Sequence, residues 1–354
     1  MVETHALWQA IKTEANRLGF NPIGAAAALP LEHFSTFEAW IQAGRHAGMG
    51  YLTREDALAK RRDPRLILEN CQSVICLALP YARSQAEMGT THSGQGRVSA
   101  YARTADYHEI IREKLAHLED YIRVRCGHPV NLKSYVDTGP VLERSYAMQA
   151  GLGIAGKHSC LLIQGIGSYF FLAEILTDLV LPLDDPFTRD LCGTCRRCID
   201  ACPTGCIHED RTLESSRCIS YLTIENKGAI PNELKRQVGP WVFGCDVCQM
   251  VCPHNARTLQ QNLPLGLPLL PEFIDLTALL QMDDETFENR FGQTPLTRAR
   301  RRGMARNAAV VLGAQFYREA LPALKDTLAR EEDPAVLDAC RWAVAQIENM
   351  DKNQ

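Results

Sequence analysis

Eight cysteines between Cys192 and Cys252 have the types and spacing of iron-sulfur ligands. The first run reads Cys192-Gly-Thr-Cys195-Arg-Arg-Cys198-Ile-Asp-Ala-Cys202-Pro203, which is the C-x2-C-x2-C-x3-C-P pattern of bacterial ferredoxins. A second, incomplete copy contains Cys245, Cys248 and Cys252-Pro253, and Cys218 upstream of it supplies the missing ligand. Thiolates in this pattern bind 4Fe-4S clusters, so the sequence predicts a redox protein that passes single electrons.

The pairing of these cysteines follows from the way such chains cross over between clusters. In two-cluster ferredoxins the fourth cysteine of each run ligates the other cluster. One cluster is therefore predicted on Cys192, Cys195, Cys198 and Cys252, and the other on Cys202, Cys218, Cys245 and Cys248. Zinc is the alternative, but zinc sites use two separated pairs and would not explain triple spacing followed twice by Cys-Pro. The six other cysteines are predicted to be small buried hydrophobes: Cys71, Cys76, Cys126, Cys160, Cys206 and Cys340.

Length and composition describe an ordinary globular chain around this module. The 354 residues are 46% hydrophobic, enough for two or three domains, and the net charge of -4 leaves room for a local basic patch. Clustered cysteines favour metal ligation in a reducing compartment over disulfides. We find no signal peptide or twin-arginine signal, and the most apolar stretch, 160–181, is interrupted by polar residues and glycines. The sequence therefore predicts a cytoplasmic protein without a membrane span.

Three regions are expected along the chain. Residues 1–186 mix helical segments with short β-type runs, such as 73–79 and 130–136, which is typical of an α/β domain. Residues 187–264 form the cysteine-rich cluster domain, and residues 265–354 are helical. Segments 306–312 and 341–347 align at an offset of 35 residues, which indicates a HEAT-like helical repeat; a plain helical cap is the alternative.

One glycine pattern resembles a nucleotide site but has the wrong context. Gly151-Leu-Gly153-Ile-Ala-Gly156 matches G-x-G-x-x-G, the dinucleotide-binding pattern. A helix is predicted before it, at 141–150, and a strand after it, at 160–163, which reverses the order that dinucleotide binding requires. A helix end and a tight turn explain these glycines better than NAD binding does.

These features in this order resemble the epoxyqueuosine reductase family over nearly the whole chain. The most specific parts are Asp137-Thr138-Gly139-Pro140, Gly153-x-x-Gly156-Lys157-His158-Ser159 and the paired cysteine sets. The resemblance implies an oxidoreductase that reduces the epoxide of epoxyqueuosine at the tRNA wobble position to queuosine, with cobalamin as cofactor. It further implies an α/β (α+β) corrinoid-binding domain related to nitroreductase and corrinoid-processing folds, a ferredoxin-like domain whose clusters feed electrons to cobalt, and helical repeats that hold the anticodon loop of the tRNA.

The resemblance also assigns roles to single residues. It makes Asp137 the proton donor; the alternative is that Asp137 only caps a helix that begins at Pro140. Beside an apolar corrin face, this carboxyl would be desolvated and its pKa raised. Other residues are implied as cobalamin contacts: Arg61, Ser99, Gly156, Lys157, His158, Ser159, Ser220 and Asp246. Ser99 departs from relatives that carry cysteine near this position, which puts any thiol role there in doubt.

A histidine ligand to cobalt is not expected. The nearest match to the Asp-x-His-x-x-Gly motif of histidine-ligated corrinoids is Asp106-Tyr107-His108, and no glycine follows it at the required position. The sequence therefore favours a cobalamin whose axial face is not occupied by the protein.

Basic residues near the clusters and in the helical region are candidate tRNA phosphate contacts. We expect contacts from Lys227, Arg300, Arg301 and Arg302, with Arg298 and Arg306 nearby. These arginines cannot all lie on one helix face, so a solvated helical surface is the alternative. We also expect an external one-electron donor such as a flavodoxin or ferredoxin. The chain itself is expected to be a monomer.

Two other functions share the same modules. A reductive dehalogenase also combines a corrinoid with iron-sulfur clusters, but acts on small organohalides and has no obvious use for C-terminal helical repeats. A ferredoxin fused to a scaffold would transfer electrons without catalysing a reaction, and it would lack corrinoid absorption.

Overall fold

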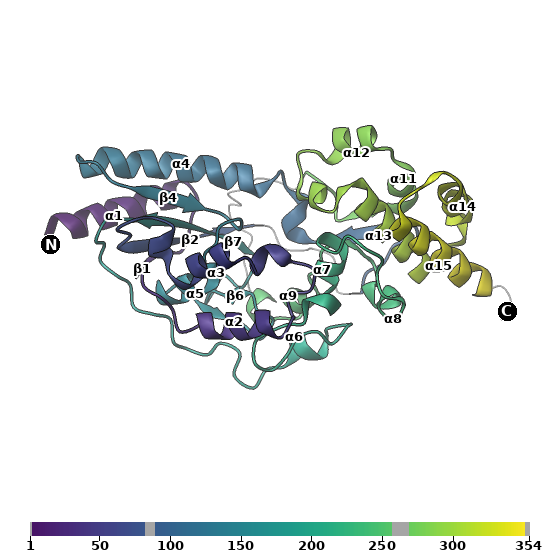
Figure 1. The fold of residues 1–354 in the computed structure, drawn as a ribbon, viewed down its shortest axis with the longest axis horizontal. Coiled ribbons are helices and arrows are strands. Elements are labelled where there is room, and N and C mark those ends of the chain that lie inside the picture. Colours follow the sequence, from purple (N-terminus) through teal and green to yellow (C-terminus); the bar gives the residue numbers. More distant parts are fainter. Residues whose placement is uncertain (1, 82–88, 257–268, 351–354) are drawn as a thin grey trace.

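The computed structural model describes residues 2–81, 89–256 and 269–350. The molecule is elongated, with the two termini at opposite ends (Figure 1). A sheet with covering helices forms the N-terminal half, and a bundle of helices forms the C-terminal end. The cysteine-rich segment lies between them.

A four-stranded antiparallel sheet organises the N-terminal half. Its strand order is β1 (Ile23–Ala27), β2 (Ser73–Pro80), β7 (Phe170–Thr177) and β4 (Leu132–Tyr135). Successive side chains of a strand point to opposite faces, so a strand covered on both faces reads as a continuous apolar run. The run in β2 shows this, because Ile75 and Leu77 pack on one face while Val74 and Cys76 pack on the other.

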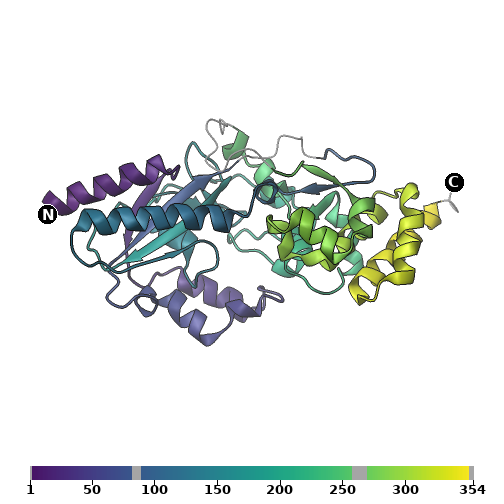
Figure 2. The same ribbon diagram turned by 90° about the horizontal axis from the view of Figure 1, so that it is seen from above.

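Helices cover both faces of this sheet. Helices α1 (Val2–Arg17) and α4 (Tyr107–Cys126) pack on the face of Ile75 and Leu77, and α5 (Glu143–Gln149) packs on the opposite face. Helices α2 (Phe34–Gln42) and α3 (Glu55–Arg62) lie on the side away from α1 and α4 (Figure 2). Helix α4 begins after Asp106, whose carboxylate accepts the N–H of His108, and ends at Gly127 with a φ of 66°.

A second sheet joins distant parts of the chain. Strand β3 (Gln95–Val98) pairs in parallel with β8 (Trp241–Phe243) and antiparallel with β9 (Phe273–Asp275). A segment from the predicted N-terminal domain therefore shares a sheet with the two later regions. The division into 1–186, 187–264 and 265–354 stays a prediction, and its second boundary lies outside the described residues.

Helices dominate the rest of the chain, and those of the cysteine-rich segment are short. In the cysteine-rich segment they are α6 (Arg197–Asp200), α7 (Ile219–Ile224), α8 (Asn232–Lys235), α9 (Val247–Met250) and α10 (Pro253–Ala256). The C-terminal helices are α11 (Leu276–Gln281), α12 (Asp284–Phe291), α13 (Arg300–Ala314), α14 (Leu321–Arg330) and α15 (Pro334–Met350). Smaller elements are the hairpin β5 (Ile154–Ala155) and β6 (Leu161–Leu162), and the 3-10 turns η1 (Gly50–Leu52), η2 (Pro64–Leu66), η3 (Ala100–Arg103), η4 (Ser215–Arg217), η5 (Arg236–Val238), η6 (Pro295–Arg298) and η7 (Arg318–Ala320).

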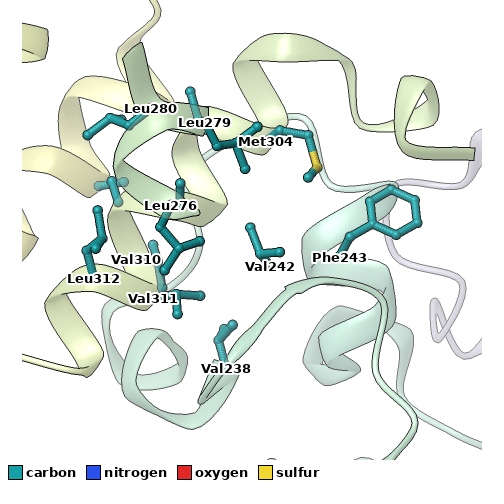
Figure 3. Close-up of a cluster of buried hydrophobic side chains, with 14 of the residues drawn as sticks. Val238, Val242, Phe243, Leu276, Leu279, Leu280, Met304, Val310, Val311 and Leu312 are labelled. Carbon is teal, nitrogen blue, oxygen red and sulfur yellow. The ribbon is translucent and has the colours of Figure 1, made fainter. Parts of the chain in front are cut away.

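One hydrophobic core is shared between the cysteine-rich segment and the C-terminal helices. Figure 3 shows Val242 and Phe243 of β8 lying with Leu276 of α11 and Met304 of α13. Burying a side chain of this size contributes about 1.5–3 kcal/mol, so this core fastens the helices to the cluster segment.

Several expected elements are confirmed. The run at 73–79 is β2, and the run at 130–136 contains β4. The G-x-G-x-x-G segment follows helix α5 and precedes β6, which is the helix-turn-strand order predicted from the sequence. The segments 306–312 and 341–347 lie on α13 and α15, which pack together, but a HEAT-like repeat stays a prediction. Of the helices described, none is long and apolar enough to cross a bilayer.

Candidate functional site

The first predicted cysteine set is brought together by the fold. Cys198 lies in α6 and Cys252 directly precedes α10, and both side chains are buried. Burial and the nearby charge of Cys192 raise the pKa of both thiols, and Cys195 also acts on Cys252. All four side chains line one small cavity.

The second predicted set gathers around Cys218 at the start of α7. Burial raises the pKa of Cys245, and the charges of Cys218 and Cys202 add to this rise. Burial also raises the pKa of Cys248, with added contributions from Cys245 and Cys218. Cys206 is buried, as predicted, but its Sγ lies 3.5 Å from that of Cys202, so it is a neighbour of this set rather than a distant core residue. Sequence spacing gave no sign of this fifth thiol.

The two sets have the chemistry of clusters rather than of a single ion. Each supplies four thiols, and a four-iron cluster binds each thiolate through a different iron atom, so its ligands surround it without meeting at one point. In the part of the chain that the structure describes, no three histidine, cysteine or acidic side chains converge as the ligands of one ion do. The donor set therefore fits the two 4Fe-4S clusters.

The Gly156–Ser159 segment lies against the cluster segment. The backbone N–H of Lys157 donates to Cys192 Sγ at 3.4 Å, and His158 lines the cavity of the first cysteine set. Ser159 has a φ of 65°, and its hydroxyl donates to the carbonyl of Arg211 at 2.7 Å. Three of these predicted cobalamin contacts thus have cluster-side neighbours.

Asp137 lies on the turn after β4, in the left-handed region with a φ of 58°. Helix α5 begins only at Glu143 and has Leu142 at its N-cap, without a side-chain cap. The alternative that Asp137 merely caps a helix beginning at Pro140 is therefore wrong. The Asp137 side chain is 64% exposed, and its Oδ2 accepts the Tyr107 hydroxyl at 2.9 Å.

Two residues at the start of α4 hold Asp137 in place. The Tyr107 ring stacks on Phe171 at 4.0 Å and on His108 at 4.1 Å, which fixes the direction of its hydroxyl. His108 Nε2 lies 3.7 Å from Asp137 Oδ2, and its Nδ1 lies 2.7 Å from Asp106 Oδ1. Both ring nitrogens of His108 thus face carboxylates, which leaves neither free to ligate cobalt.

His108 and Asp137 carry opposite charges in this structure. Burial opposes charge on His108, but its hydrogen bonds to Asp106 and Asp137 outweigh it and raise the pKa of His108 to about 9. The Asp137 side chain keeps exposed surface, but the protein atoms around it displace part of its water, which by itself would raise its pKa. The nearby charge of His108 and the Tyr107 hydrogen bond outweigh this and hold the pKa below its ordinary value. In this structure the shared proton therefore rests on His108, and the raised pKa expected for Asp137 beside a corrin face stays a prediction.

Two carboxyl groups that interact with Asp137 can hold further protons. Glu174 on β7 is fully enclosed, and Glu143 at the start of α5 is half-buried with its Oε1 shielded from water. Burial, followed by the charge of Asp137, raises the pKa of Glu143 to about 8, and burial raises that of Glu174 well above its ordinary value. At least one of these carboxyls therefore stays protonated near neutrality.

Three regions of the chain meet around Asp137. Tyr51 from η1, Glu225 after α7 and Arg298 from η6 all interact electrostatically with one another, and Arg298 Nε donates to Glu225 Oε1 at 2.7 Å. Tyr51 is 46% exposed. The sequence alone did not identify Tyr51, Glu225, Tyr107 or His108 as site residues. These residues meet only in the fold, and no local sequence pattern indicates such a meeting.

The other predicted cobalamin contacts lie on the edges of this region. Ser99 and Asp246 are buried neighbours, since Asp246 Oδ2 accepts the N–H of Ala100 at 2.7 Å. Ser220 lies on α7, two residues after Cys218. Arg61 on α3 lies over the Phe37 ring, and burial lowers its pKa.

The candidate tRNA contacts separate into exposed and occupied side chains. Arg300 and Arg302 are exposed at the start of α13, with Arg302 only 3.5 Å from Asp333. Arg301 is 16% exposed and paired with both Asp284 and Glu331. Lys227 is exposed, and its Nζ donates to two backbone carbonyls.

Arg306, considered with them, is buried inside the protein. It is 1% exposed, and its guanidinium donates to the carbonyls of Leu222, Asn226 and Gly228. The prediction that the Arg306 side chain contacts a tRNA phosphate is therefore wrong.

Two sets of four thiols, in a chain that also holds an ordered acid-base group, fit an iron-sulfur oxidoreductase. A family model described as "4Fe-4S double cluster binding domain" matches residues 191–255, which confirms the two predicted clusters. A second model, "Epoxyqueuosine reductase QueG, DUF1730", matches residues 61–138, up to the residue after Asp137.

Relatives extend the match over almost the whole chain. The epoxyqueuosine reductase of Cyclobacterium marinum is 39% identical over 307 residues, covering 86% of this chain and 96% of that protein. That of Escherichia coli K12 is 36% identical over 352 residues, covering 98% and 90%. The chain belongs to the epoxyqueuosine reductase family, whose members are oxidoreductases of tRNA modification, and this favours that reading over a reductive dehalogenase.

Solved structures agree with this membership. A crystal structure of an epoxyqueuosine reductase with an epoxyqueuosine-modified tRNA-Tyr stem loop has a TM-score of 0.88 at 29% identity, covering 98% of this chain and 93% of that one. The epoxyqueuosine reductase of Streptococcus thermophilus has a TM-score of 0.87 at 27% identity, covering 97% and 90%.

Proposed function

We propose that this chain performs its family's reaction with Asp137 as the proton donor, with both thiol sets as cluster ligands and with cobalamin as the second cofactor. The observation that carries the proposal is the exposed Asp137 carboxylate, held by Tyr107 and His108 where three regions of the chain meet. An exposed acid on an ordered support can reach a substrate.

The reaction sets the number of protons that the protein must supply. Reducing an epoxide to an alkene breaks both C–O bonds, forms a C=C bond, and consumes two electrons and two protons to release water. Asp137 would deliver a proton to the leaving oxygen, and the proton held on His108 Nε2 would replace it across 3.7 Å. Substrate and cofactor covering Asp137 would exclude water, which raises the pKa of a carboxyl and favours its protonated form.

The electrons would enter through the clusters. The predicted ligand sets are Cys192, Cys195, Cys198 and Cys252 for one cluster, and Cys202, Cys218, Cys245 and Cys248 for the other. An external one-electron donor such as a flavodoxin or ferredoxin would reduce them. When bound, cobalamin supplies the cobalt chemistry at the carbon centre that a cluster by itself seldom provides.

The chain's own residues support cobalamin binding near Asp137. Tyr51 and Asp137 keep exposed surface there, and His108 is committed to two carboxylates, which agrees with a cobalt that this protein does not ligate through histidine. The contacts proposed by resemblance remain Arg61, Ser99, Asp137, Gly156, Lys157, His158, Ser159, Ser220 and Asp246.

The tRNA would lie over the C-terminal helices. The related structure that contains a modified tRNA stem loop supports tRNA as a partner, and the exposed side chains of Arg300, Arg302 and Lys227 are the proposed phosphate contacts. Arg301 would act mainly by supporting the start of α13, because its guanidinium is already paired. We further propose that the protein works in the cytoplasm as a monomer.

Turnover of a defined substrate tests this proposal. The anaerobic chain, loaded with iron, sulfide and cobalamin and given a chemical reductant, should convert epoxyqueuosine in a tRNA anticodon stem loop to queuosine, detected by mass spectrometry as the loss of one oxygen. Asp137→Asn should keep both clusters and cobalamin but slow turnover by about 10²-fold or more, the scale of general acid catalysis.

A matched control separates charge from chemistry. Asp120→Asn removes an exposed carboxylate of α4 that pairs only with neighbours on its own helix, and should leave turnover unchanged. No product from the fully loaded wild-type chain would refute the substrate, whereas near-native turnover by Asp137→Asn would reduce Asp137 to a turn residue.

A further inference from the structure

His158 is a buried histidine with one uncommitted ring nitrogen. Its side chain is among the buried polar groups, at 3% exposure, and its Nε2 has no hydrogen-bond partner among the residues that the structure describes. Buried polar groups are nearly always paired, so an unpaired one calls for an explanation.

The other ring nitrogen fixes where the proton lies. The backbone N–H of Cys160 points at His158 Nδ1 over 3.2 Å, so Nδ1 acts as the acceptor. A ring nitrogen that accepts a hydrogen bond carries no proton, and the proton of the ring must then be on Nε2. The uncommitted atom is therefore an N–H donor without an acceptor.

The first cysteine set surrounds the space next to this donor. His158 lines one cavity together with Cys192, Cys195, Cys198 and Cys252, all four of the proposed ligands. The adjacent backbone N–H of Lys157 already donates to Cys192 Sγ at 3.4 Å. The same loop thus directs donors toward the ligand set.

We propose that His158 donates a hydrogen bond from Nε2 to a sulfur of the 4Fe-4S cluster held by this first set, and so makes that cluster easier to reduce. The inference rests on the ligand set proposed above. Reduction adds negative charge to the cluster, and hydrogen bonds to an acceptor strengthen as its charge grows, so a donor stabilises the reduced form. In this role His158 contacts the cluster and tunes the electron path, and it needs no contact with the substrate.

Redox titration of the fully loaded protein, followed by electron paramagnetic resonance, tests this inference. His158→Phe keeps a ring but removes the donor, and one of the two cluster potentials should fall. We expect the equilibrium constant for reduction to drop about tenfold, which is about 59 mV for one electron. His158→Gln, whose amide N–H reaches nearly as far as Nε2, should restore most of the potential.

His254 provides the matched control. Its ring lines the same cavity, but its Nε2 already contacts the carbonyl of Leu191 at 2.8 Å, so it has no spare donor. His254→Phe should therefore shift the potentials much less than His158→Phe. Equal shifts in both variants, or no shift in either, would overturn the role of His158.

Iron content separates this inference from the ligand proposal. About eight iron atoms per chain with unmoved potentials would refute His158 alone, whereas about four would refute the two ligand sets and the inference with them. Because a buried substitution can block assembly, the wild-type protein labelled with ¹⁵N-histidine gives a second measurement. Pulsed electron paramagnetic resonance of its reduced clusters should detect a weakly coupled histidine nitrogen that His254→Phe retains, and its absence would contradict the hydrogen bond.

Discussion

Replacing Arg306 should lower the stability of the protein without directly weakening its binding of tRNA. The guanidinium is 1% exposed and donates at 2.7 Å to the carbonyls of Leu222, Asn226 and Gly228. These carbonyls belong to α7 and to the loop after it, so Arg306 connects the cluster segment to α13. Arg306→Met keeps the length of the stem and removes every one of these hydrogen bonds.

The size of the effect follows from what each carbonyl loses. A buried acceptor left without a donor costs about 1–3 kcal/mol. The Leu222 carbonyl is enclosed and would lose that amount, whereas water can reach the exposed Gly228 and partly replace the donor. Burying Arg306 also has a cost, visible in the fall of its pKa to about 10, and methionine avoids it. We therefore expect a net loss of about 3 kcal/mol, or roughly 4 °C in the melting temperature of a chain of this length.

Thermal unfolding of samples with matched iron content is the assay, because bound clusters themselves raise the apparent stability. Arg302→Met is the control, since its exposed side chain lies 3.5 Å from Asp333 and such surface pairs contribute about 0–1 kcal/mol. A variant Arg306→Met with wild-type melting but weaker tRNA binding would refute the reasoning and return Arg306 to the phosphate contacts.

Three further predictions concern the clusters, the tRNA and pH. Cys195→Ser should remove one cluster and leave the other partly intact, so that iron per chain falls to about half. The double change Arg300→Ala and Arg302→Ala should weaken tRNA binding and flatten its dependence on log salt by roughly 1.4–1.8, as expected for two lost phosphate contacts. His108 has a pKa raised to about 9 from an ordinary 6.5, so its stabilising contribution should be complete below pH 6.5 and lost as pH rises through 9; Asp106→Asn should reduce this slope in unfolding experiments.

Each of these has a control and a contrary outcome. Cys126→Ser, far from both thiol sets in sequence, should leave the iron content unchanged, and zinc as the main metal in the wild type would contradict the cluster assignment. If tRNA affinity and its salt dependence do not change after loss of both arginines, these side chains only form part of the solvated surface of α13. A pH slope that survives Asp106→Asn would show that another group titrates.

The cysteine sets and the strand β2 could be predicted because their signals are local. The Cys-x2-Cys spacings and the continuous apolar run each lie within a few residues, whereas joining Cys192 to Cys252 in one set relied on the known crossing-over of two-cluster ferredoxins. The support of Asp137 is different, since Tyr107 reaches it from 30 residues away and Arg298 from a separate region. No periodicity or spacing records that meeting, so the acid could be predicted from the sequence but the groups that set its charge could not.

Arg306 shows a related limit. Basic residues near the start of a helix favour a surface reading, and the sequence alone did not distinguish Arg306 from Arg302. The signal that could have done so is the run Met304–Leu312, which is buried on every side in the structure. A helix enclosed all round leaves no surface position for an arginine in its middle.

Strand β3 has a consequence for how the chain is made. It pairs with β9, which the ribosome produces about 175 residues later, and with β8, which also comes late. At a synthesis rate of about 5–20 residues per second, β3 must wait roughly 9–35 seconds before its neighbours exist. The N-terminal sheet is complete once β7 has been made, so it can form during that interval while β3 stays without a partner. The second sheet can therefore close only after the whole cysteine-rich segment has been made.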